Sequence, residues 1–88
     1  MRPRGPRGGG DGVPTEFKSL QPGATPSTVR NQLNTAKGQA LDAVLDSRGS
    51  GLDEAGARAG IEDFLRRNRP GRMNFIRVVG DGFDVTWP

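Results

Sequence analysis

Glu16 and Lys18 stand two positions apart in the segment VPTEFKSL, and their side chains are the ones in this sequence most suited to joint chemistry. In an extended strand, side chains two positions apart project from the same face. A carboxylate beside an ammonium suits metal-assisted cleavage of a phosphodiester, because the carboxylate can hold a divalent cation while the amine offsets transition-state charge. The same spacing also fits a solvent-facing ion pair, which adds about 0–1 kcal/mol of stability.

A strand is predicted to carry this pair over residues 13–20, because polar and apolar residues alternate there. Phe17 lies between the two charged residues and is expected to point the opposite way, into the core. Pro14 near the start favours an edge position, since proline donates no hydrogen bond to a neighbouring strand.

Polar side chains also gather on the first predicted helix, which covers about residues 26–37. Thr25 followed by Pro26 is typical of a helix start. Arg30, Asn34 and Lys37 follow at i, i+4 and i+7, so one side of the helix can offer cations and an amide to RNA phosphates or base edges. A solvated helix face accounts for the same pattern.

A second metal ligand is needed if Glu16 binds Mg²⁺, because this ion is usually held by one or two protein carboxylates. Asp11 and Asp46 are the candidates. Asp46 ends the apolar segment 41–46, which we interpret as a buried strand, although Val44 and Leu45 could also extend the preceding helix. The sequence has no cysteine or histidine, which excludes disulfides, thiolate or imidazole metal sites and histidine acid–base catalysis.

The remaining elements complete a small domain. A helix is predicted over residues 53–68, where acidic residues at the start and arginines at the end favour the helix dipole. Two strands follow, at residues 73–79 and 83–87, and the turn Gly80-Asp81-Gly82 joins them as a hairpin. The predicted order is therefore β-α-β-α-β-β, an α/β or α+β domain with a small mixed sheet and two helices.

Length and composition limit the number of domains and the class of protein. A chain of 88 residues with 32% hydrophobic and 26% charged residues supports one domain, which we place at residues 13–88. Residues 1–12, rich in Gly, Arg and Pro, are expected to form a disordered basic arm without the apolar region of a signal peptide. No apolar stretch reaches the roughly 18 residues of a membrane span. The net charge of +3 permits RNA binding but does not require it.

Several segments together resemble one known family. The segments DGVPTEFKSL, AKGQ, AVLDSRGSGL, DEAGARAGI and IRVVGDGFDVTW are similar, in order and spacing, to the C-terminal tRNase domain of CdiA-type contact-dependent growth inhibition toxins, a branch of the PD-(D/E)xK nuclease superfamily. The resemblance covers about residues 11–87. It implies that Glu16 and Lys18 are the E-x-K pair, that Lys37 and Gln39 lie at the helix end beside the active site, with Gln39 as a third catalytic residue, and that Mg²⁺ or another divalent cation is the cofactor.

The resemblance also implies a biological role. Such a toxin enters the cytoplasm of a neighbouring bacterium and cleaves tRNA there, and a cognate immunity protein neutralises it in the producing cell. These nucleases take an aspartate from the strand before E-x-K, and residues 4–10 contain no carboxylate. We therefore expect a PD-(D/E)xK-like core that lacks its first strand. Two alternatives follow, an inactive remnant that still binds RNA or an immunity protein, and a small binding module that depends on the basic arm.

Overall fold

The computed structural model describes residues 15–68 and 71–88, so the predicted arm and Asp11 lie outside the described residues. The predicted order of elements is confirmed, and the observed boundaries differ from the expected ones by at most two residues. The elements are β1 (Thr15–Ser19), α1 (Pro26–Ala36), β2 (Asp42–Asp46), α2 (Glu54–Arg67), β3 (Phe75–Gly80) and β4 (Phe83–Trp87).

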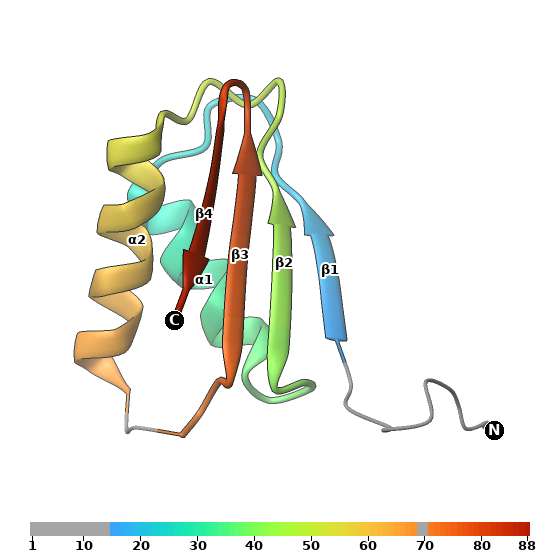
Figure 1. Ribbon diagram of the computed structural model, residues 1–88, viewed down its shortest axis with the longest axis vertical. Coiled ribbons are helices and arrows are strands. Elements are labelled where there is room, and N and C mark those ends of the chain that lie inside the picture. The colour runs from blue at the N-terminus through green and yellow to red at the C-terminus, as the bar shows by residue number, and fades with distance from the viewer. Residues whose placement is uncertain (1–14, 69–70) are drawn as a thin grey trace, which may run out of the picture.

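The four strands form one mixed sheet in the order β1-β2-β3-β4, which confirms the predicted fold class. β1, β2 and β3 are parallel, and β4 returns antiparallel to β3 as the predicted hairpin. Connections between parallel strands are almost always right-handed. Because each new parallel strand is added on the same side of the previous one, both connecting helices fall on one face of the sheet (Figure 1).

The core lies between this face and the two helices. The alternating burial of β2 and β3 places every second side chain under the helices, where the apolar faces of α1 and α2 cover them. The fully buried side chains with the largest volumes come from all of these elements; the apolar ones are Phe64, Leu33, Leu45, Ile76, Val29 and Val78.

Both helices begin where the sequence predicts them. Thr25 and Thr28 form a capping box, in which the Thr28 N–H donates to Thr25 Oγ1 at 3.3 Å and the Thr25 N–H donates to Thr28 Oγ1 at 3.0 Å. Asp53 caps α2, because its Oδ1 accepts from the Gly56 N–H at 2.7 Å. Within the described residues, neither helix is long and apolar enough to cross a membrane.

Phe17 contradicts the sequence analysis. It was expected in the core, but it is 70% exposed. The register explains this outcome, since Glu16 and Lys18 pair with the buried Ala43 and Leu45 and therefore face the helices. The alternation of β1 was predicted correctly, but the side of the sheet that the helices cover is set by the crossovers, which local alternation does not reveal.

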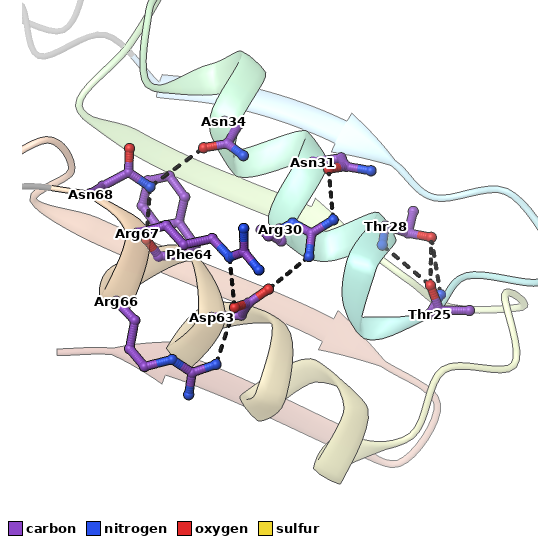
Figure 2. A network of polar contacts seen from close by, with 10 residues as sticks. All are labelled: Thr25, Thr28, Arg30, Asn31, Asn34, Asp63, Phe64, Arg66, Arg67 and Asn68. Atoms are coloured by element: carbon purple, nitrogen blue, oxygen red, sulfur yellow. Dashed lines mark hydrogen bonds and ion pairs between the residues drawn. The ribbon is translucent and has the colours of Figure 1, made fainter.

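The two helices approach each other closely at Gly60 and are joined by an ion pair. Arg30 Nη1 of α1 donates to Asp63 Oδ2 of α2 at 2.8 Å. Asp63 also accepts from Arg66 at 3.1 Å and from Arg67 at 2.9 Å (Figure 2). Arg66 therefore pairs with Asp63 and not with Glu62, the partner that its i, i+4 spacing suggests.

Replacement of Gly60 by alanine tests the close helix contact. The added methyl carbon would lie 2.6 Å from Val29 Cβ and 2.7 Å from the Pro26 carbonyl oxygen. Gly→Ala in an open helix stabilises by about 1 kcal/mol, whereas overpacking costs about 1–3 kcal/mol. We expect Gly60→Ala to lower the urea midpoint. The control Gly38→Ala, whose added carbon meets nothing nearer than the Thr35 carbonyl oxygen at 3.8 Å, should leave it unchanged or raise it. A higher midpoint for Gly60→Ala would contradict this packing.

The ion pair makes a pH-dependent contribution. The hydrogen bond from Arg30, followed by that from Arg67, holds the pKa of Asp63 well below its usual range. The unfolded chain therefore binds the proton first as pH falls, so this stabilisation is present above about pH 4 and is lost as the pH falls through the folded-state pKa. We expect Asp63→Asn to lower the melting temperature at pH 7 and to match wild type more closely near pH 2. The exposed control Glu62→Gln should show no such convergence, and an equal deficit for Asp63→Asn at both pH values would argue against this contribution.

Candidate functional site

The predicted acid and amine lie together in the structure. Lys18 Nζ is 3.2 Å from Glu16 Oε2, and the two side chains are 35% and 25% exposed, respectively. Both project from the helix-covered face of β1, which is the edge strand of the described sheet next to β2. Because β1 forms the rim of that face, the pair borders the core but remains accessible to solvent. A phosphate oxygen can therefore reach the ammonium without disturbing the packed interior.

No acidic residue other than Glu16 lies on the described helix-covered face of β1 and β2. Asp42 and Asp46 pair in register with Thr15 and Ser19, so both side chains belong to the open face. Asp46 is engaged by Arg48, whose Nε and Nη2 donate to the two carboxylate oxygens at 2.9 and 3.0 Å. These hydrogen bonds, with one from the Arg48 N–H, lower the pKa of Asp46 to about 2. The structure therefore does not bring Asp46 to Glu16.

The supply of metal ligands is correspondingly limited. Among residues 15–68 and 71–88, no group of three acidic, histidine or cysteine side chains gathers to hold a cation. Glu16 is the one carboxylate on the described helix-covered face of β1 and β2. Mg²⁺ keeps several waters and is often held by one or two carboxylates together with substrate phosphates. A divalent cation therefore fits the described residues only if the bound substrate supplies further ligands, with Glu16 as the protein ligand.

Lys37 occupies the C-terminal end of α1. Its Nζ donates a hydrogen bond of 2.5 Å to Oδ1 of Asn68, the C-cap residue of α2. Asn68 Nδ2 in turn donates to the Phe64 carbonyl oxygen at 2.7 Å and to Asn34 Oδ1 at 3.4 Å (Figure 2). The amide of Asn68 is thus fixed by α1 and α2 together, and it holds the Lys37 ammonium between the two helix ends.

The other two predicted residues of this region have different surroundings. Gln39 is exposed in the turn between α1 and β2, where its N–H donates to the Ala36 carbonyl oxygen at 2.8 Å. Arg30 does not face an open site, because its guanidinium is held by Asp63 between the helices. Its side chain is 23% exposed. The structure therefore gives Arg30 a stabilising contact, while Gln39 and Lys37 lie near the start of β2.

Glu16, Lys37 and Gln39 lie at one end of the molecule. The crossover helices run antiparallel to the parallel strands, so the end of α1 meets the start of β2 (Figure 1). Glu16 pairs with Ala43, the second residue of β2, and so belongs to the same end. Asp46 and Arg48 lie at the opposite end of that strand. The start of β2 therefore has Glu16, Lys37 and Gln39 near it, while Lys18, in register with Leu45, lies toward the C-terminal end of β1.

Sequence reasoning missed two cations at this end. Lys37, Arg67, Asn68 and Arg72 line a cavity of about 410 Å³. Arg67 was attributed to the helix dipole and to an i, i+4 pair with Asp63, which the structure shows, and Arg72 was not singled out. The available signal was the arginine-rich sequence that runs from the end of α2 toward β3. The pocket forms because the ends of α1 and α2 converge there, a contact between distant segments that composition does not report.

The comparisons with known proteins bear on the whole domain. The family model described as the contact-dependent growth inhibition CdiA C-terminal domain matches residues 11–84. No curated protein and no solved structure matches the chain. The matched region includes both helices, the Glu16–Lys18 pair and the basic pocket. Because it spans most of the 88 residues, the chain belongs to the contact-dependent growth inhibition CdiA C-terminal domain family and is a toxin domain of that system.

Proposed function

We propose that this toxin domain is a metal-dependent ribonuclease that cleaves tRNA in the cytoplasm of a target bacterium. The observation that carries the proposal is the Glu16–Lys18 pair, with its charged atoms 3.2 Å apart on an accessible edge strand. The E-x-K pattern of the PD-(D/E)xK nucleases requires this arrangement, an acid and an amine on the same face of one strand. The basic end of the molecule supports the choice of RNA as substrate.

The two side chains have complementary roles in this proposal. Cleavage breaks one phosphorus–oxygen bond as a water oxygen bonds to phosphorus. The electron pair of the broken bond stays on the leaving sugar oxygen, which takes up a proton while the attacking water loses one. The Glu16 carboxylate orients that water and accepts a hydrogen bond from it, while the Lys18 ammonium faces the phosphate oxygens and offsets the charge that develops on them. A divalent cation bound with the substrate at Glu16 would add Lewis-acid polarisation of the phosphate.

Residues at the neighbouring helix end bind the RNA backbone. Lys37 contacts a phosphate, and Asn34 acts through Asn68 to hold the Lys37 side chain in place. Gln39, exposed beside the start of β2, offers an amide to the substrate near the reacting phosphate. Three arginines pair with Asp63, namely Arg30, Arg66 and Arg67, so this region keeps a net positive charge. That charge attracts the rest of the RNA backbone.

A cognate immunity protein completes the proposed system. CdiA toxin domains typically pair with immunity proteins. A cell that makes a tRNase needs such a protein because its own tRNA is an equally good substrate. We infer that the immunity protein of this toxin domain blocks access of RNA to the basic end of the molecule.

One observation favours a second candidate function. The described residues place a single carboxylate beside Lys18, and Asp46 is on the other face of the sheet. A domain with an incomplete ligand set could retain binding and lose cleavage. The alternative is therefore an inactive toxin remnant that binds RNA or an immunity protein.

Cleavage of purified tRNA separates these functions. We expect the wild-type chain to cut tRNA in the presence of Mg²⁺ and to stop when the ion is chelated. Glu16→Gln and Lys18→Met should each reduce the rate by about 10²–10³-fold, the usual loss when a group that stabilises the transition state is removed. The measurement is the rate of fragment formation on a denaturing gel.

The matched control is Asp84→Asn, which removes one charge of an exposed ion pair on the open face of the same sheet. It should cleave tRNA at the wild-type rate. Intact tRNA after incubation with wild-type protein would rule out the ribonuclease. RNA binding that persists in Glu16→Gln and is indifferent to chelators would then identify the remnant.

A further inference from the structure

A second cavity adjoins the basic pocket at the end of α2. It has a volume of about 300 Å³, and Asn68 and Arg72 line both cavities. Its other walls are mainly apolar and come from α2, from the segment before β3 and from the last residue of β4. They are Phe64, Leu65, Gly71, Met73 and Trp87.

We propose that the two cavities together bind one unpaired nucleotide of an RNA strand. The base enters the apolar cavity against Trp87, and its phosphate lies in the basic pocket among Lys37, Arg67 and Arg72. The assignment rests on the proposed function in one respect, that RNA is the substrate. It adds a binding subsite separate from Glu16 and Lys18, which line neither cavity.

The apolar cavity has the size and walls that suit a single base. Small-molecule sites commonly measure about 300–1,000 Å³, so this cavity lies at the lower limit and suits one flat ring system. Trp87 is half-buried and packs against the core through part of its surface, which fixes the ring as a stacking surface. Aromatic rings bind bases without regard to sequence, because every base has a π face.

The basic pocket supplies the complementary charge. Lys37 is held in place by Asn68 at 2.5 Å, and Arg67 is held by a hydrogen bond from its Nε to Asp63 at 2.9 Å. Within the described part of the chain, no carboxylate pairs with Lys37 or Arg72. The dipoles of α1 and α2 explain a cation at each helix end, but they do not explain Arg72, which a separate segment brings to the same cavity. Three cations from three segments fit a phosphate group.

The position of Asn68 connects the two halves. It lines both cavities, and among the described residues its side-chain hydrogen bonds are to Phe64, Asn34 and Lys37. Its amide therefore serves to orient Lys37 at the boundary between the apolar and the basic cavity. A nucleotide bound there spans that boundary, with its sugar above Asn68.

Trp87 provides a direct readout, because it is the one tryptophan in the sequence and tyrosine is absent. We would titrate Glu16→Gln protein with a single-stranded RNA pentamer and follow tryptophan fluorescence. Stacking on Trp87 should quench the emission. Adenosine alone and inorganic phosphate alone should quench at least tenfold less effectively at equal concentration, because each fills only one cavity.

Lys37→Met and Arg72→Met test the phosphate half. Each should weaken RNA binding about tenfold and lower the slope of log affinity against log salt by about 0.7, the value for one lost contact to a single-stranded phosphate. The control Arg48→Met removes an arginine at the opposite end of β2 and should change neither quantity. Trp87→Leu, measured by anisotropy of labelled RNA, should weaken binding while circular dichroism remains that of the folded domain.

The outcomes separate this subsite from the proposed ribonuclease. Quenching that depends on Lys37 and Arg72 supports the subsite even if tRNA is never cleaved. Cleavage without quenching, or with quenching that the Lys37 and Arg72 variants leave unchanged, overturns the subsite while the ribonuclease stands. Adenosine monophosphate that binds as tightly as the pentamer would overturn the assignment to RNA, because the site would then take a free nucleotide.

Discussion

The crossover geometry of β1-α1-β2-α2-β3 is the constraint on which the rest of the structure depends. Three parallel strands added in one direction, with connections of one hand, force both helices onto the same face of the sheet. That choice creates the core under α1 and α2, brings both helix ends to the starts of the strands, and leaves the opposite face without helices in the described residues. Glu16 and Lys18 then lie at the rim of the covered face, where β1 has β2 on one side.

Charge is distributed to match this arrangement. The ends of α1 and α2 carry partial negative charge and meet near Asn68, so cations are favoured there. Part of that positive charge is used inside the molecule, since Asp63 joins α1 to α2 through Arg30 and also accepts from Arg66 and Arg67. The other cations, Lys37 and Arg72, line the pocket together with Arg67. The interaction that binds the helices together thus also builds the surface that we assign to RNA.

The family assignment and the proposed chemistry rest on different observations. Membership of the CdiA C-terminal domain family follows from a match over residues 11–84 and makes the chain a growth inhibition toxin domain. Its action on tRNA and its use of a metal are proposals that come from the resemblance to the PD-(D/E)xK toxin nucleases, and Glu16, Lys18 and the basic end support them. The acids of the open face point away from Glu16 and Lys18, and two of them are engaged by arginines, Asp46 by Arg48 and Asp84 by Arg77.

Local sequence determined the six elements, their order and the pairing of Glu16 with Lys18, because strand alternation, Thr25–Pro26 capping and the Gly80–Gly82 turn act over only a few residues. The tertiary structure decided which face of β1 the helices cover, and it thereby placed Phe17 in solvent and separated Asp46 from Glu16. It alone joined Arg72 to Lys37 and Trp87 to Phe64. Such contacts depend on how distant segments pack, and the alternation of residues along one strand is the same whichever face is buried.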